Sequence, residues 1–189
     1  MNIEKLPLNG LMRLTPRQFR DDRGVFWETW RSGMFQDDQG HNFEFVQENL
    51  SISKAGTVRG LHFQRDPHAQ GKLVRVASGR IWDVAVDVRA SSPTRGRWFG
   101  AELSSETGQQ LWIPRGFAHG FVALTDHAVV EYRCTALYEP SAEGSIRWND
   151  PTLGIDWPPA ALSGSNLGPV LSEKDANAPL LDGEHWPFD

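Results

Sequence analysis

Short apolar segments, separated by turn residues, recur along the middle of the chain. Residues 73–77 (LVRVA) lead through 78–80 (SGR) into 81–88 (IWDVAVDV), which predicts two strands joined by a tight turn. Within the second segment Asp83 and Asp87 alternate with apolar side chains, so the carboxylates face one side of the strand and the apolar residues face the other. The pattern therefore predicts a β-hairpin with acidic groups on one face.

Further short segments of β-branched and aromatic residues follow this hairpin. They span residues 98–103, 110–113, 117–124, 128–135 and 144–148. Helical periodicity is nearly absent, with room for a turn or two of helix at 32–36 and at 172–176. The stretch from Pro158 onward is rich in Pro, Ser and Gly and is expected to wrap the surface. We predict one all-β domain over residues 1–189, a barrel or sandwich with a few short peripheral helices.

Composition and charge narrow the classes of partner. The chain has 189 residues, of which 39% are hydrophobic and 23% are charged, and this balance is typical of a globular domain with a sizeable core. Its formal net charge of −5 argues against a general affinity for nucleic acid or for anionic lipid. A few local Arg and Lys side chains can still bind an anionic small molecule.

Cysteine usage and the first residues point to a compartment. Cys134 is the single cysteine, so a disulfide within the chain is impossible and a reducing compartment fits. Residues 1–5 (MNIEK) lack the apolar core of a signal peptide, and no segment is long and apolar enough to cross a membrane. We therefore expect a cytoplasmic protein without a membrane partner.

Two histidine segments have similar local sequences. The first is 56–64 (GTVRGLHFQ) and the second is 108–119 (GQQLWIPRGFAH). They resemble the two motifs of the cupin superfamily, which implies a jelly-roll β-barrel with ligand-binding residues on its inner surface. The second segment matches the motif in its glycine, proline and histidine spacing. The first departs from it: Gln64 stands where metal-binding cupins have a second histidine, and residues 67–69 (PHA) stand where they have a glutamate.

This departure argues against a metal. A catalytic metal site needs three or more suitable ligands that converge on one point. Only His62 and His119 remain, Gln64 is a poor ligand, and His68 follows a proline in an expected loop. We therefore expect neither a metal nor another cofactor.

Without a metal, His62 becomes a candidate base, because histidine titrates near neutral pH. It shares strand parity with Gln64, whereas Arg59 faces the other way if the strand is regular. The alternative is a structural histidine within a hydrogen-bond network. Lys72 and Tyr132 favour catalysis, because a base, a cation and a phenol can remove a proton beside a ketone, hold the enolate and return the proton.

Longer segments, between about residue 19 and residue 175, resemble the dTDP-4-dehydrorhamnose 3,5-epimerase family. They are 47–51 (QENLS), 58–64 (VRGLHFQ), 70–74 (QGKLV), 83–89 (DVAVDVR), 92–94 (SPT), 111–121 (LWIPRGFAHGF), 148–151 (WNDP) and 171–175 (LSEKD). Such long motifs are far more specific than a single glycine-rich loop.

The resemblance implies a dTDP-linked 4-keto-6-deoxy sugar as substrate and inversion at C3 and C5 without metal or organic cofactor. It implies that His62 is the base and that Asp175 orients it. Asp83, on the polar side of its strand, is the alternative partner that strand geometry permits. The resemblance further implies that Tyr132 is the acid and that Lys72 faces the oxygen of the C4 enolate.

The resemblance also assigns contacts to the nucleotide and the sugar. The implied substrate-binding residues are Arg23, Glu28, Gln47, Glu48, Asn49, Arg59, Lys72, His119, Tyr138, Glu143 and Lys174. Arg23 and Arg59 suit the diphosphate, because a guanidinium gives phosphate two parallel hydrogen bonds. Tyr138 matches an aromatic residue that stacks on thymine. Two departures stand out: Trp27 replaces a Phe or Tyr, and the segment 161–168 is longer than the usual connection.

The resemblance implies a homodimer that exchanges strands or extends sheets, in which N-terminal residues complete the partner's site. Three other functions remain open at this stage. The chain could invert a single carbon of a related dTDP-keto sugar, bind such a sugar without catalysis, or act as a metal-dependent cupin enzyme.

Overall fold

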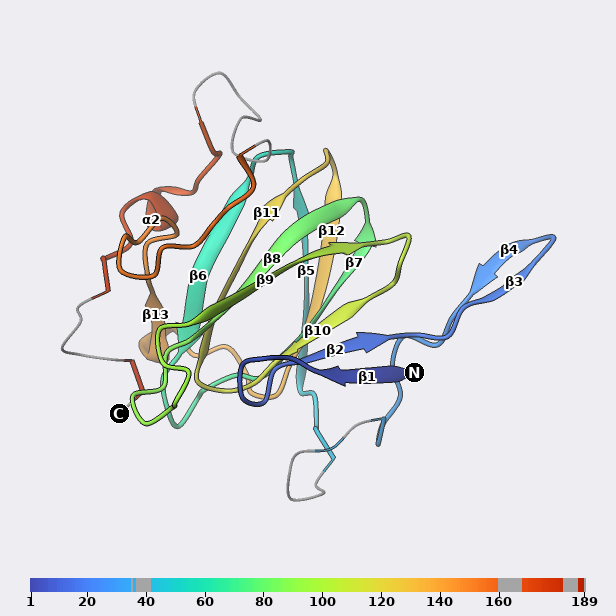
Figure 1. Cartoon of the computed structure of the whole chain (residues 1–189), viewed down its shortest axis with the longest axis horizontal. Coiled ribbons are helices and arrows are strands. Elements are labelled where there is room, and N and C mark those ends of the chain that lie inside the picture. The colour runs from blue at the N-terminus through green and yellow to red at the C-terminus, as the bar shows by residue number, and fades with distance from the viewer. Residues whose placement is uncertain (35, 37–41, 160–167, 182–186, 189) are drawn as a thin grey trace.

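Two antiparallel β-sheets face each other in the computed structural model (Figure 1). The structure describes all residues except 35, 37–41, 160–167, 182–186 and 189. The six-stranded sheet has the order β1-β2-β10-β7-β12-β5, the five-stranded sheet has the order β13-β6-β11-β8-β9, and β3 and β4 form a separate hairpin. This is the predicted all-β, jelly-roll type of architecture.

The six-stranded sheet comprises β1 (Asn2–Lys5), β2 (Met12–Thr15), β5 (Gln47–Ser53), β7 (Lys72–Ser78), β10 (Gln110–Ile113) and β12 (Ala128–Cys134). The five-stranded sheet comprises β6 (Val58–Gln64), β8 (Arg80–Asp87), β9 (Trp98–Ser104), β11 (Phe117–Ala123) and β13 (Glu143–Ser145). The strands expected from the hydrophobic pattern are confirmed within a residue or two, apart from 144–148. That strand ends at Ser145, because the amide of Asp150 already closes a turn onto the carbonyl of Arg147.

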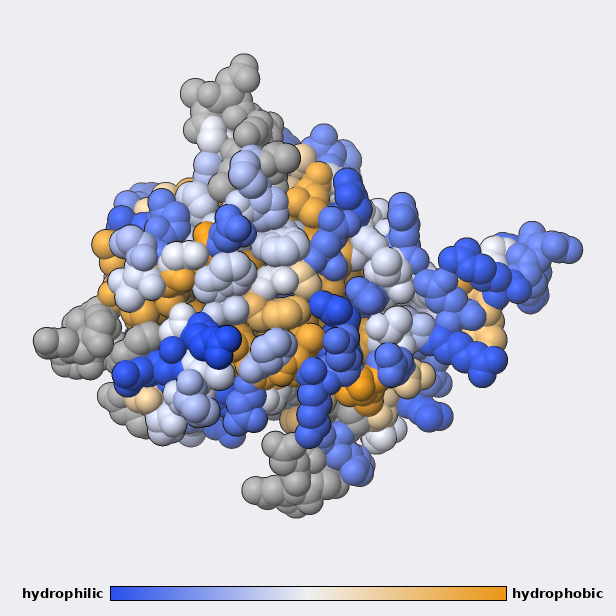
Figure 2. Space-filling model, viewed as in Figure 1, coloured by the Kyte–Doolittle hydropathy of each residue, from blue (hydrophilic) through white to orange (hydrophobic). Residues whose placement is uncertain are grey.

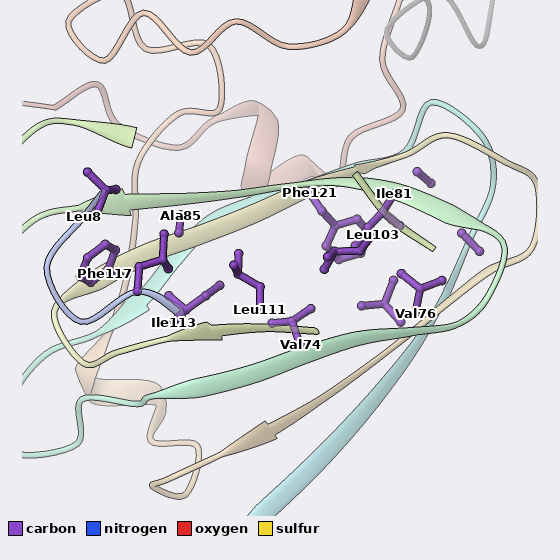
Figure 3. Close-up of a cluster of buried hydrophobic side chains, with 14 residues drawn as sticks. Leu8, Val74, Val76, Ile81, Ala85, Leu103, Leu111, Ile113, Phe117 and Phe121 are labelled. Carbon is purple, nitrogen blue, oxygen red and sulfur yellow. The ribbon is translucent and has the colours of Figure 1, made fainter. Parts of the chain in front are cut away.

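Apolar side chains from both sheets fill the space between them, as Figure 3 shows for Val74 and Leu111 on one side and Ile81, Ala85 and Phe121 on the other. All of these are almost fully buried. Burying one such larger aliphatic or aromatic side chain stabilises the fold by roughly 1.5–3 kcal/mol. This cluster occupies part of the interior only, and the polar residues that point inward occupy the rest.

The outer face of the five-stranded sheet is also buried. Val84 and Val86 of β8 pack there with Val58 of β6 and with Trp157 and Leu181 of the C-terminal segment. This explains why β8 alternates between carboxylates and valines and yet is covered on both faces. The described parts of the stretch from residue 158 therefore lie on the surface of the sheet, as expected.

Two local elements complete the fold. The helix α2 (Glu173–Ala176) begins at the N-cap Ser172, whose hydroxyl accepts from the amide of Asp175, and it confirms the helical turn expected at 172–176. In the other expected turn, the amide of Met34 donates to the carbonyl of Arg31, but residue 35 lies outside the described residues.

No helix in the described part of the chain is long and apolar enough to cross a membrane.

The hairpin of β3 (Phe19–Asp21) and β4 (Gly24–Phe26) projects away from both sheets (Figure 1). Its charged side chains stand beside exposed apolar ones on the projecting arm (Figure 2). Phe19 and Phe26 are 50% and 70% exposed, and their rings lie 6.4 Å apart. The arm therefore leaves much of its apolar surface in contact with solvent.

Candidate active site

Polar side chains of the six-stranded sheet point into the space between the sheets. Lys72 shares a face of β7 with the core residue Val74, and Tyr132 shares a face of β12 with the core residue Val130. Asn49 of β5 is paired directly with Tyr132 and therefore lies on the same side. The alternation of these strands thus brings three predicted site residues into the interior.

The five-stranded sheet supplies the opposite wall, and Arg59 belongs to it. His62 is paired with His119 and Arg59 with Phe121, with a register shift between the two pairs. Because paired residues share a face and His119 and Phe121 are two residues apart, His62 and Arg59 face the same side. The expectation that Arg59 faces away from His62 is wrong, because β6 is not a regular strand.

The irregularity of β6 is located at Gly60. A Cβ atom at this position would lie 2.5 Å from the Cα atom of Gly120 on the neighbouring strand, so the close approach of the two backbones requires glycine. Nε of Arg59 then donates to the hydroxyl of Ser53, 3.1 Å away on β5. Arg59 therefore connects β6 to the end of β5 in the other sheet, although it remains exposed to solvent.

His62 lies against a carboxylate from the C-terminal helix. Its Nε2 is 2.5 Å from Oδ1 of Asp175, which is 4% exposed. Burial works to raise the pKa of Asp175, but hydrogen bonds with His62 and Ser172 hold this pKa below its ordinary value. An ionised Asp175 therefore fixes the ring of His62 with its Nε2–H toward the carboxylate, and Nδ1 is left to accept a proton.

Asp83 forms a second histidine–carboxylate pair. Its Oδ1 lies 2.8 Å from Nε2 of His119, and both side chains are buried. The two candidate partners of His62 are thereby separated: Asp175 contacts His62, and Asp83 contacts His119. The other oxygen of Asp83, Oδ2, is buried and has no hydrogen-bond partner among the described residues.

Lys72 and Tyr132 are both desolvated. Burial lowers the pKa of Lys72, although the nearby Cys134, Asp83 and Glu143 oppose this effect. Burial likewise raises the pKa of Tyr132, against the influence of the Arg59 charge. A cation in such a dry site acts strongly on a developing oxyanion, and the phenol stays protonated until a strong base forms beside it.

A third group of predicted residues meets at the end of the site near α2. Nζ of Lys174 lies 2.5 Å from Oε1 of Glu143, and the hydroxyl of Tyr138 donates to Oε2 of the same carboxylate at 3.1 Å. The amide of Tyr138 donates to Oε1 of Gln47 at 2.8 Å. Glu143 is paired with Gln64, two residues from His62, so this group adjoins the proposed base.

The side-chain amide of Gln64 is occupied by hydrogen bonds and is not available to bind a metal. Its side-chain nitrogen donates to the carbonyls of His68 and Leu137 at 2.7 and 3.1 Å, and its oxygen accepts from the amide of Glu139 at 2.8 Å. Among the residues that the structure describes, no three His, Cys, Asp or Glu side chains are grouped in a way that could hold a metal ion.

Three predicted contact residues lie outside this site. Arg23, 90% exposed at its side chain, is on the projecting hairpin and pairs with Asp21, while Glu28 pairs with Arg31. Glu48 alternates with Gln47 and Asn49 along β5, so it lies on the outer face of the sheet, where Nε of Arg133 contacts it at 3.3 Å.

Two residues at the site were not expected from the sequence, namely Ser53 and Ser172. Ser53 continues the inward row that begins at Gln47, so the alternation of β5 could have revealed it. Ser172 caps the helix that carries Asp175. A serine with an acidic residue three positions later is a recognisable signal for the start of a helix.

A large cavity of the molecule lies elsewhere. It measures about 1160 Å³ and is lined by residues of the loop between β1 and β2, by Phe43, Trp112 and Arg115, and by their neighbours, with none of the predicted site residues among them. The chemistry of the inward-facing side chains, rather than cavity size, identifies the candidate site.

Comparisons with known proteins give one consistent family. The family model described as dTDP-4-dehydrorhamnose 3,5-epimerase matches residues 5–183. The chain is 50% identical over 182 residues to the dTDP-4-dehydrorhamnose 3,5-epimerase of Salmonella typhimurium, with 96% of each chain covered. It is 46% identical to the crystal structure of that enzyme from Elizabethkingia anophelis NUHP1, with a TM-score of 0.86 and 96% of each chain covered.

A further solved structure carries a ligand. The dTDP-6-deoxy-D-glucose-3,5-epimerase of Legionella pneumophila Philadelphia 1 was solved in complex with dTDP-4-keto-L-rhamnose. This chain is 42% identical to it, with a TM-score of 0.84, and the match covers 100% of this chain and 98% of that one.

Proposed function

The chain belongs to the dTDP-4-dehydrorhamnose 3,5-epimerase family, and from this premise we propose that it converts dTDP-4-dehydro-6-deoxy-D-glucose to dTDP-4-dehydro-L-rhamnose for dTDP-L-rhamnose biosynthesis. The observation that carries the proposal is the His62–Asp175 pair on the side of the five-stranded sheet, toward which Lys72 and Tyr132 point from the six-stranded sheet. This set holds a base, a cation and an acid, which are the groups that an inversion beside a ketone needs.

In the first step Nδ1 of His62 removes the proton from a carbon that flanks the C4 ketone. The electron pair of the broken C–H bond forms a C=C bond, and the carbonyl electrons move to the C4 oxygen as an enolate. Asp175 stabilises the imidazolium that results. The ammonium of Lys72 faces the enolate oxygen, where a fixed charge in a dry site is most effective.

In the second step the phenol of Tyr132 delivers a proton to the opposite face of the same carbon. The enolate collapses to the ketone, and the phenolate recovers a proton by way of solvent, while the imidazolium loses its own. Both C3 and C5 flank C4, so one enolate-binding site serves both inversions in turn. The reaction consumes no oxidant and needs no cofactor.

The remaining inward-facing residues suit the nucleotide. Arg59 offers a guanidinium to the diphosphate, and His119, held by Asp83, offers a second polar contact. Tyr138 presents an aromatic face for thymine, and Gln47, Asn49, Glu143 and Lys174 supply polar contacts around it. Glu48 does not belong to this set, because its side chain faces the outside of the sheet.

We further propose that the protein works as a homodimer in the cytoplasm. Arg23 and Glu28 lie on or beside the projecting hairpin, so they contact substrate only if that arm reaches the site of a second copy. The exposed Phe19 and Phe26 of the arm would be buried by the same contact. A mass of two chains by light scattering is expected, and a stable single chain would contradict the proposal.

Incubation with dTDP-4-keto-6-deoxyglucose in D₂O tests the activity. Deuterium at both C3 and C5 is expected, because both carbons exchange their proton with a solvent-equilibrated His62 or Tyr132. Deuterium at one carbon would indicate a single-site epimerase, and none at all would indicate a binding protein.

Activity that survives exhaustive chelation would exclude a metal-dependent reaction. The variants His62→Ala and Tyr132→Phe serve as controls, with a loss of roughly 10²–10⁴-fold expected for each.

A further inference from the structure

Three glutamine side chains hold the backbone of residues 136–139. Gln70 donates to the carbonyl of Ala136 at 2.8 Å, and Gln64 donates to the carbonyl of Leu137 at 3.1 Å. The amide of Tyr138 donates to Gln47, and the amide of Glu139 donates to Gln64, both at 2.8 Å. Four consecutive residues of one loop are therefore fixed by side chains of β5, of β6 and of the loop before β7.

Gln64 holds the central position in this arrangement. It is 4% exposed. Its side-chain nitrogen donates to the carbonyl of Leu137 in this loop and to the carbonyl of His68, and its side-chain oxygen accepts from the amide of Glu139 in the loop. An amide is the side chain that can donate twice and accept at once. A histidine or a carboxylate at this position could not satisfy all three backbone groups, and buried polar groups left without partners are costly.

The loop that Gln64 holds carries Tyr138. The backbone of this residue is fixed on both sides, and its hydroxyl donates to Glu143, although the ring itself is 51% exposed. A large aromatic ring that is exposed yet restrained at three points is prepared to bind a flat partner without paying the cost of ordering a loop.

We propose that Gln64 is a positioning residue for nucleotide recognition: it fixes the loop 136–139 so that the ring of Tyr138 is preorganised for thymine, and it does so from the strand that carries the base His62. The inference rests on the proposed function, because it needs thymidine diphosphate as the ligand. It predicts that Gln64 governs affinity for the nucleotide and leaves the proton transfers at the sugar largely unaffected.

Gln64→Met tests this, because methionine preserves the volume and removes all three hydrogen bonds. The dissociation constant for dTDP, measured by calorimetry, is expected to rise about tenfold, while kcat for deuterium incorporation at saturating substrate stays within about threefold of wild type. Thr125→Val is the matched control: its hydroxyl accepts from the amide of Arg80 in a turn away from the site, so the dTDP affinity of this variant should not change.

A double-mutant cycle separates positioning from general stability. If Gln64 acts through the ring, Gln64→Met has little further effect on dTDP affinity once Tyr138→Ala is present. Additive losses, an unchanged affinity in the single variant, or an equal fall in kcat would each overturn the inference. If Gln64→Met does not fold, Gln70→Met removes one hydrogen bond from the same loop, and a smaller loss of affinity is expected.

The same assay separates this inference from the proposed function. A wild-type protein that neither binds dTDP nor exchanges deuterium would overturn both. A wild-type protein that does both, with Gln64 variants of normal affinity, would overturn the inference alone.

Discussion

At the scale of single residues, Lys72 shows a conflict between stability and chemistry. Its side chain is 9% exposed, and in the described part of the chain its ammonium forms no ion pair. Burial lowers its pKa in the folded state. The native protein therefore binds this proton less tightly than the unfolded chain does, and the charged lysine disfavours folding until the pH rises toward the ordinary value of about 10.4.

We expect Lys72→Met to make the protein more stable and nearly inactive. At pH 7 the free energy of unfolding should increase by on the order of 1–3 kcal/mol, because a buried charge is removed whose desolvation outweighs the attraction of the nearby Asp83 and Glu143. The rate of deuterium incorporation should fall roughly 10²–10³-fold, because the enolate loses its cation. Urea unfolding and the exchange assay measure the two effects. The exposed Lys54→Met should change neither, and a Lys72→Met protein of lower stability would contradict the argument.

The residues also show what a sequence can and cannot reveal. The inward direction of Lys72 and Tyr132 follows from strand alternation, which is a local property. The face of Arg59 does not, because it depends on the register shift of β6 against β11. The choice between Asp83 and Asp175 as the partner of His62 depends on which distant segments meet, and no local pattern encodes that.

At the scale of elements, the β3–β4 hairpin could be only half anticipated. Residues 23–26 (RGVF) look like a turn that enters a strand, but nothing local indicates that the hairpin leaves the body of the molecule. The strand β5 is likewise hard to recognise in the sequence, because its pattern of polar and apolar residues is unusual. Its apolar Leu50 and Ile52 are more than half exposed and its polar residues face inward, which inverts the usual pattern of a half-buried strand.

If the arm serves a neighbouring copy, two inactive variants should rescue each other. Arg23→Ala damages the arm and His62→Ala damages the base, so each homodimer is impaired at both of its sites. A mixed dimer contains one site with the intact His62 of one chain and the intact Arg23 of the other. Mixing and exchanging the two proteins should restore roughly a quarter of wild-type deuterium incorporation, since about half of the dimers are mixed and each has one good site.

The controls for this experiment are direct. The separate proteins should stay impaired under the same mixing protocol, and a mixture of His62→Ala with Tyr132→Phe should show no rescue, because both residues belong to the same chain's site. Rescue by that second pair, or none by the first, would contradict an arm that acts across subunits.

At the scale of the whole molecule, buried carboxylates should make stability fall in acid. Asp87 is fully buried and accepts from Arg89, from the hydroxyl of Ser92 at 2.5 Å and from the hydroxyl of Thr94 at 2.6 Å. Burial opposes ionisation, but these donors hold the pKa of Asp87 below its ordinary value. A carboxylate with a lowered folded-state pKa contributes stability above about pH 4, and this contribution is lost as the pH falls through the lowered pKa.

Asp87→Asn should therefore cost about 2 kcal/mol at pH 7, and its deficit relative to wild type should shrink toward pH 2. Urea unfolding at a series of pH values measures both quantities. Asp22→Asn, at an exposed position, is the control and should follow wild type throughout. Parallel pH curves for wild type and Asp87→Asn would contradict this account.

The pairing of His62 with Asp175 also imposes an order of events during synthesis. The two residues are 113 positions apart, and the carboxylate comes from a segment translated after all the strands. At roughly 5–20 residues per second, the ribosome needs on the order of ten seconds to make the intervening chain. The His62–Asp175 contact can therefore form only after the last strand has been made, when the four-residue helix packs beside β6.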